Sequence, residues 1–101
     1  MLNALVEAEV RSLPADMRAR LEQISRMIEE FGLEGIRASD VTHLRGPLCE
    51  IRIRGRDGIS RALYVTAAGR RVVIVRVFIK KTRTTPAREI ELALKRAKEV
   101  W

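Results

Sequence analysis

The fold is decided by a short stretch of the chain, residues 49–60, which reads CEIRIRGRDGIS. Charged and apolar residues alternate over residues 50–54, and alternation with a period of two is typical of a strand that buries one face. Asp57 followed by Gly58 is a strong signal for a tight hairpin turn. The stretch therefore predicts an antiparallel hairpin whose first strand has one cationic face.

The sequence after the hairpin predicts a third strand. Residues 59–66 form the expected return strand, residues 67–70 a second turn, and residues 71–79 a strand rich in β-branched side chains. Strands joined in chain order by short turns form an antiparallel meander. We therefore expect a three-stranded antiparallel sheet at the centre of the domain.

Helices are expected on both sides of this meander in the chain. Residues 2–11 have apolar residues at helical spacing, and a second helix begins near Pro14 and ends at Gly32. After the third strand, Thr85 as the N-cap and Pro86 as the first helical residue predict a terminal helix.

The apolar stripes of these helices favour a role in the core. The stripe of the second helix consists of Met17, Leu21, Ile24, Ile28 and Phe31. The stripe of the terminal helix consists of Ile90, Ala93, Leu94, Ala97 and Trp101. A stripe could bind a partner instead, but amphipathic helices usually pack on their own domain. The sequence predicts one α+β domain over residues 1–101, with N-terminal helices, the meander and a C-terminal helix, all helices lying on one sheet face.

Length and composition exclude several classes of protein. With 101 residues, Cys49 as the only cysteine and His43 as the only histidine, the chain has neither an intrachain disulfide nor the ligands of a Cys/His zinc site. No apolar run is long enough for a membrane span, and the N-terminus does not have the pattern of a signal peptide. We expect a cytoplasmic protein without a metal or other cofactor.

Positive charge is concentrated in the middle of the chain. Residues 45–86 contain eleven basic and two acidic residues, whereas residues 1–44 contain five basic and eight acidic ones. Sixteen of the 20 basic residues are arginines, whose planar guanidinium suits phosphate. This distribution predicts a polyanionic partner, nucleic acid first and an acidic protein second. The alternative is a basic face that serves solubility only.

The expected register gathers cations on one face of the hairpin. With a turn at residues 57–58, Arg54 lies opposite Arg61 and Arg52 lies opposite Leu63, so that the three arginines share a face. Like charges directly opposite one another cost stability. Three guanidinium groups without a carboxylate among them therefore indicate a site for an anion.

The third strand extends this predicted surface. Arg76, Phe78 and Lys80 point to one side, and Lys81 continues the cationic surface at the strand end. An aromatic ring in the sheet could stack on a base. Phe78 is one candidate for this role, and Tyr64 is the other, although Tyr64 fits better beneath the helices.

Acidic residues are too few in the basic segment for a carboxylate-bound metal nuclease. Glu50 and Asp57 are the only two between residues 45 and 86. If the domain cleaves RNA, we expect cations to stabilise the crowded phosphate while the 2′-hydroxyl of the RNA attacks.

Five short segments occur in a characteristic order along the chain. They are LPAD at 13–16, LRG at 44–46, LCEIR at 48–52, DGISR at 57–61 and KKTRTTPAREIE at 80–91. In this order they resemble the HigB-like, phage-derived branch of the RelE/ParE toxin superfamily. The similarity covers roughly residues 4–99, and the last segment is its most specific part.

The resemblance implies a toxin of a type II toxin–antitoxin module. Such a protein has a small α+β fold, uses no metal, cleaves mRNA on the ribosome, and is silenced by a cognate helix-turn-helix antitoxin. Charge pattern and motif position together predict four catalytic residues, namely Arg61, Lys81, Arg52 and Arg54. They also predict five RNA-binding residues, namely Arg45, Arg76, Phe78, Lys80 and Arg83.

Three departures from the family pattern leave other functions open. The late tyrosine has no counterpart between Thr82 and Pro86, Cys49 stands where tryptophan is common, and residues 76–78 replace the usual His-Gly-Phe. One alternative is a catalytically decayed module that binds RNA or an antitoxin. The other is an inhibitor of a different target such as gyrase, because one fold supports several activities.

Overall fold

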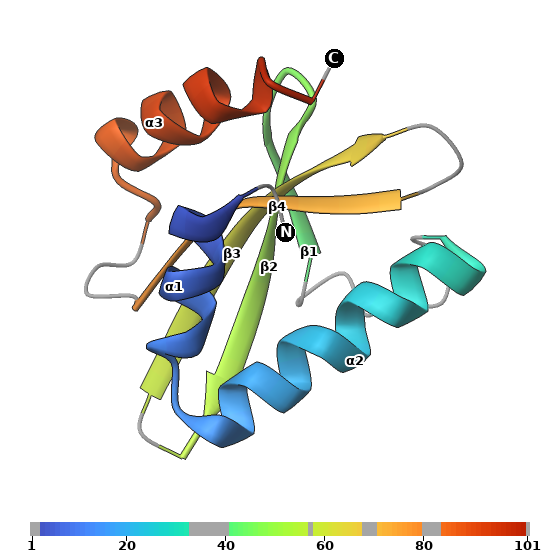
Figure 1. Cartoon of the computed structure of the whole chain (residues 1–101), viewed down its shortest axis with the longest axis vertical. Helices are drawn as coiled ribbons and strands as arrows, with labels where there is room; N and C mark the ends of the chain where they lie inside the picture. The colour runs from blue at the N-terminus through green and yellow to red at the C-terminus, as the bar shows by residue number, and fades with distance from the viewer. Residues whose placement is uncertain (1–2, 33–40, 57, 68–70, 80–83, 101) are drawn as a thin grey trace.

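The chain has an α+β fold in which helices precede and follow a four-stranded antiparallel sheet (Figure 1). A computed structural model describes residues 3–32, 41–56, 58–67, 71–79 and 84–100. The strands are adjacent in the order β1-β2-β3-β4. The elements are α1 (Ala4–Arg11), α2 (Ala15–Phe31), β1 (Val41–Arg45), β2 (Leu48–Gly55), β3 (Gly58–Ala67), β4 (Arg71–Ile79) and α3 (Ala87–Ala97). The expected fold class is therefore confirmed.

The strand β1 was not predicted from the sequence. It pairs antiparallel with β2, and the pairing is irregular between His43 and Arg45. Only Val41 and Leu44 are partly buried, and they are three positions apart. Because the irregularity breaks the alternation of exposed and buried residues, this segment lacks the period of two that identifies a strand.

The hairpin of β2 and β3 forms, but its turn lies one residue earlier than expected. Gly55 pairs with Gly58, which places Arg52 directly opposite Arg61 and Arg54 opposite Ile59. The predicted register was therefore wrong by two positions. Because side chains alternate with a period of two, a shift of two keeps each residue on its predicted face.

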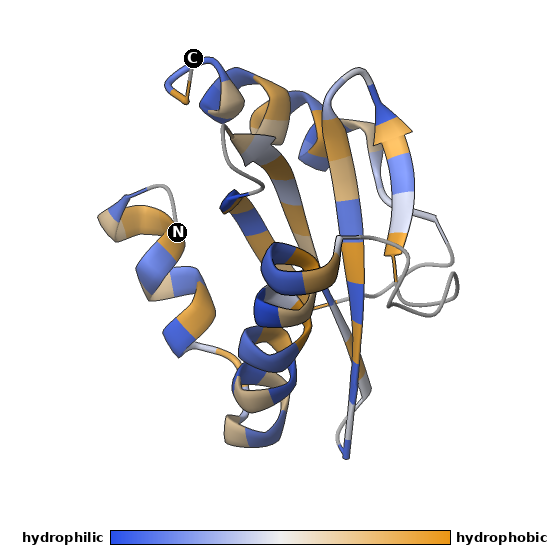
Figure 2. Ribbon diagram, turned by 90° about the vertical axis from the view of Figure 1, so that its right-hand side faces the viewer, coloured by the Kyte–Doolittle hydropathy of each residue, from blue (hydrophilic) through white to orange (hydrophobic). Residues whose placement is uncertain are grey.

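Helices cover both faces of the sheet, contrary to the prediction of one covered face. The helices α1 and α2 pack with Ile51, Ala62 and Tyr64 in one apolar cluster. The helix α3 packs on the other face, against a cluster that includes Leu48 and Leu63. Residues 62–65 of β3 are all buried, so that both faces of this strand need a cover. Figure 2 shows the hydrophobic and hydrophilic bands along the strands and helices.

The helical stripes are confirmed apart from their ends. The residues of the α2 stripe are buried up to Ile28, whereas Phe31, the last residue of the helix, is 62% exposed. Gly32 ends α2 with a positive φ of 70°, which suits glycine. On α3, Ala93 and Ala97 are buried, while Trp101 lies outside the described residues.

The outer edge of β4 is covered by side chains from three helices. Carboxylates of Glu29 and Glu9 accept hydrogen bonds from the amides of Val72 and Val77, each at 3.0 Å. The guanidinium of Arg96 donates to the Val75 carbonyl at 2.9 Å. These backbone groups are the ones that would otherwise pair with a further strand. Among the described helices, none is long and apolar enough to cross a membrane.

Candidate nucleic-acid interface

The strands β2 and β3 bring three of the predicted site residues onto the sheet face that α3 partly covers. Arg52 and Arg54 alternate along β2 with the buried Ile51 and Ile53, and Arg61 lies opposite Arg52. Their exposure differs: Arg54 is exposed, Arg52 is half-buried and Arg61 is buried. The face therefore has an accessible cation, Arg54, near a buried one, Arg61.

Arg61 is held in a buried ion pair with Glu50. Its Nη1 lies 3.3 Å from Glu50 Oε2, and both side chains are only 3% exposed. The hydroxyl of Thr85 accepts a hydrogen bond from Arg61 and donates one to Glu50. Because Thr85 lies just before α3, this network also fixes the start of that helix against the sheet.

Glu50 and Thr85 are site residues that the sequence interpretation missed. The expectation of a cationic face without a carboxylate was wrong, because Glu50 alternates with Arg52 along β2 and so shares its face. The alternation itself contained this signal. Thr85 was expected to cap the terminal helix, but the N-cap is Pro86, which provides no side-chain hydrogen bond. The Thr85 hydroxyl is instead engaged with the charged pair.

Arg52 and Arg54 carry the positive charge that the Glu50 pair does not offset. No ion pair joins either of them to another residue in the described ranges. The Nε of Arg52 is buried, and within the same ranges it has no hydrogen-bond partner. A buried guanidinium nitrogen without a partner favours binding of an acceptor such as a phosphate oxygen.

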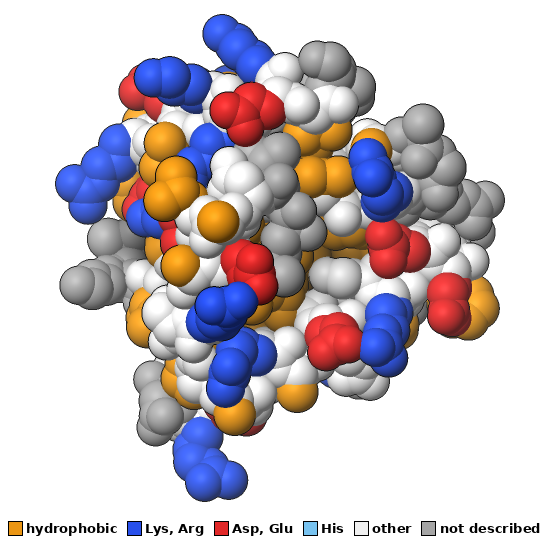
Figure 3. Space-filling view, viewed as in Figure 1, with side chains coloured by type: hydrophobic (Ala, Val, Ile, Leu, Met, Phe, Trp, Pro, Cys, Tyr) orange, Lys and Arg blue, Asp and Glu red, His pale blue; other side chains and the backbone are white. Residues whose placement is uncertain are grey.

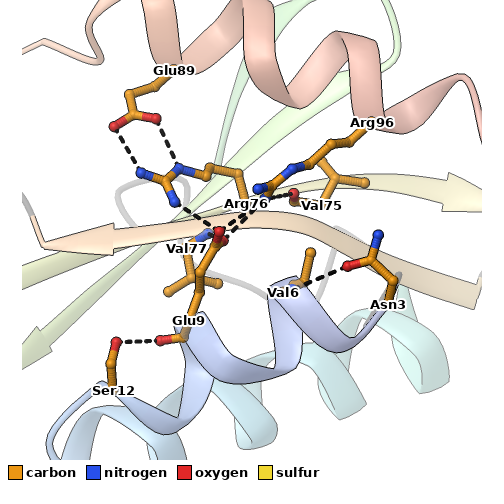
Figure 4. A network of polar contacts seen from close by, with 9 residues as sticks. All are labelled: Asn3, Val6, Glu9, Ser12, Val75, Arg76, Val77, Glu89 and Arg96. Atoms are coloured by element: carbon orange, nitrogen blue, oxygen red, sulfur yellow. Dashed lines mark hydrogen bonds and ion pairs between the residues drawn. The ribbon is translucent and has the colours of Figure 1, made fainter.

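Arg76 lies in a polar network that ties α1 and α3 to β4 (Figure 4). Its guanidinium is 2.8 Å from Glu9 and 2.8 Å from Glu89, and Arg96 is 3.0 Å from Glu9. The hydrogen bond to Glu89, with a contribution from Glu9, raises the pKa of Arg76. Its charge is therefore shared with two carboxylates, and its predicted role in RNA binding stays a prediction.

Phe78 is the aromatic residue of the candidate surface. It is half-buried, pairs across the strands with Arg61, and packs against the apolar cluster beneath α3. The guanidinium carbon of Arg76 lies 5.7 Å from the centre of its ring, which is within the range of a cation–π contact. The predicted role of Phe78 in stacking on a base stays a prediction.

The remaining predicted site residues lie at the borders of this surface or outside the described ranges. Arg45 is exposed at the end of β1, and β2 separates it from β3. Lys80, Lys81 and Arg83 follow β4 in the sequence and lie outside the described residues.

Tyr64 packs on the opposite face, beneath α1 and α2, as expected. It is 1% exposed and lies opposite Cys49. Burial raises the pKa of the Tyr64 phenol and also that of the Cys49 thiol. Tyr64 is therefore a neutral core residue and has no access to a base.

Comparisons with known proteins place this arrangement in a family. The model of a family described as "Phage derived protein Gp49-like (DUF891)" matches residues 8–98, which extend from α1 to the end of α3. A search of curated proteins finds no match. In the part of the chain that the structure describes, no three His, Cys, Asp or Glu side chains are grouped to hold a metal ion.

Proposed function

Because the chain belongs to the Gp49-like family of phage-derived proteins, which is part of the RelE/HigB-type toxin family, we propose that it is a ribosome-dependent mRNA endonuclease. The family is associated with the toxins of toxin–antitoxin modules, and it implies an antitoxin partner. We propose further that cleavage needs no metal and that the antitoxin is a helix-turn-helix protein.

One observation carries the proposal, namely the cationic face formed by Arg52, Arg54 and Arg61. Arg54 is accessible to a phosphate, and the buried Nε of Arg52 is a donor that has no partner among the residues that the structure describes. Arg61 is fixed by Glu50 and Thr85. Cations that are held in place before the reaction stabilise charge that develops on the phosphate without a cost of reorganisation.

In the proposed reaction the RNA supplies its own nucleophile. The 2′-hydroxyl gives up its proton to water as its oxygen bonds to phosphorus. The bond to the 5′-oxygen breaks and that oxygen takes up a proton from water, which leaves a cyclic 2′,3′-phosphate and a 5′-hydroxyl. Arg52, Arg54 and Arg61 stabilise the added negative charge, and Lys81 extends the catalytic set. Arg45, Arg76, Lys80 and Arg83 bind the RNA backbone, and Phe78 stacks on a base.

Cleavage of mRNA in a reconstituted translation reaction tests this proposal. The Arg52→Gln/Arg54→Gln variant removes two charges without breaking the Glu50 pair, and we expect at least a 100-fold loss of cleavage rate. The Arg20→Gln/Arg26→Gln variant removes two charges from α2 and should cleave like the wild type. Equal cleavage by both variants would contradict the assignment of the site.

A second function is favoured by the ion pairs of the site. Glu50 offsets the charge of Arg61, and Glu9 and Glu89 offset that of Arg76, which is consistent with a module that binds RNA without cleaving it. Salt-sensitive RNA binding by a folded wild-type protein that shows no cleavage would support this function instead.

A further inference from the structure

A groove on the side of the sheet that α1 and α2 cover has no role in the proposed cleavage. It lies between α1, α2 and β4 and has a volume of about 870 Å³. Its floor is mostly apolar, with Val10, Ala19, Leu21 and Ile74 among the lining residues. In Figure 3 apolar side chains lie in a hollow among charged ones on this side. The groove and the Arg52 surface belong to opposite faces of the sheet, because Ile74 packs with α1 and α2.

We propose that this groove binds a short amphipathic helix of the antitoxin, with apolar residues on its floor and acidic residues at its rim. A groove of about 870 Å³ has room for a short helical segment. The inference rests on the proposed function in one respect: membership in a toxin family supplies the partner.

The covered edge of β4 favours a helix over an added strand. A strand that docks beside β4 needs the outward amides of that strand as donors. Those of Val72 and Val77 already donate to Glu29 and Glu9. A helix satisfies its own backbone groups and needs only side-chain contacts, so that it can enter the groove without displacing these carboxylates.

The charges on the rim indicate an acidic occupant. Two of its four arginines have local partners, because Arg11 pairs with Glu7 and Arg26 with Glu22. The third lining acid, Glu29, is bound to a backbone amide. The other two arginines, Arg18 and Arg71, are exposed, and neither has an ion pair with the residues that the structure describes.

Ser25 also lines the groove, but its Oγ is buried and so is not exposed to an occupant. The floor and the rim therefore indicate the occupant. An apolar floor and a cationic rim together match a helix with one apolar stripe and acidic flanks.

The test measures binding of the full chain to its antitoxin, with both proteins purified from a co-expressed complex. The Arg18→Glu/Arg71→Glu variant should bind at least tenfold more weakly at low salt, because two attractive contacts become repulsive. The Arg20→Glu/Arg88→Glu variant has the same net charge and should bind like the wild type. A steric pair is independent of charge: Ala19→Trp fills the groove and should weaken binding, whereas Ala8→Trp, on an exposed site outside it, should not.

The possible results separate the groove from the cleavage site. Unchanged affinity of both groove variants would overturn the proposal. Self-association that the groove variants abolish would identify a second copy as the occupant and would overturn it too. RNA cleavage by the free chain is measured in parallel. We expect the groove variants to retain it, so that a failure of the cleavage proposal is seen separately.

Discussion

Replacing Glu50 with glutamine removes the negative charge from the buried pair with Arg61 and should lower the free energy of unfolding by about 3 kcal/mol. The two charged groups are 3.3 Å apart, and both side chains are 3% exposed. Breaking a pair of this kind by removing one partner costs roughly 3–5 kcal/mol, because a charge is left with less compensation in a buried place. Glutamine keeps the shape and one acceptor, so that we expect the lower end.

The loss is measured by urea unfolding followed by circular dichroism. A matched control is Glu22→Gln, which breaks the exposed pair with Arg26 on α2 and should cost less than about 0.5 kcal/mol. In a chain of this length 1 kcal/mol corresponds to roughly 4–8 °C, so that Glu50→Gln should lower Tm by about 12–24 °C.

A double variant distinguishes lost charge pairing from lost packing. Glu50→Leu combined with Arg61→Met removes both charges and should be more stable than either single change. The reasoning would be refuted if Glu50→Gln unfolded within about 0.5 kcal/mol of the wild type.

Three further predictions concern the core and the covered edge. Burial raises the pKa of Tyr64, the only tyrosine, above the usual tyrosine value of 10.0. The neutral phenol therefore contributes its full stability below pH 10.0, and this contribution is lost as the pH rises from there through the raised pKa of the folded protein. Absorbance at 295 nm should therefore report phenolate only on alkaline unfolding, and ionisation near pH 10 in a native protein would contradict this. Glu9→Gln weakens contacts with two partly buried arginines and should cost about 1–2 kcal/mol in urea unfolding, against less than about 0.5 kcal/mol for the exposed pair broken in Glu7→Gln. Gly55→Ala places a methyl group 2.7 Å from Cγ of the buried Met17 and should lower stability by about 1–3 kcal/mol, and a thermal melt equal to wild type would exclude the clash.

Local patterns predicted most of the elements because their signals lie within a few residues. The stripe of α2 and the alternation of β2 follow from periodicity, and Gly32 ends its helix as expected. The strand β1 was missed because its irregular pairing removes the alternation. The prediction that α3 packs on the same face as the other helices was wrong, because the sequence pattern of its own helix does not show that β3 is buried on both faces.

The candidate site was predictable as a set of residues but not as a set of contacts. The alternation of side chains along the strands was sufficient to place Arg52, Arg54 and Arg61 on one face, although the predicted register was wrong by two positions. The pairing of Glu50 with Arg61 and Thr85 depends on contacts across 11 and 35 residues of chain, which no local signal encodes. The ion pair of Arg76 with Glu9 was missed for the same reason, because most of the sequence separates the two residues.

The carboxylates at β4 also limit how the sheet can grow. With Glu9 and Glu29 bound to two of its outward amides, β4 is a poor template for another strand, and among the described strands β1 forms the other edge of the sheet. Two copies that join through β1 use up each other's remaining edge, so that such a sheet stops at eight strands. By occupying the edge of β4, the two acidic side chains favour an assembly that stops at two copies over a fibre to which strands are added without limit.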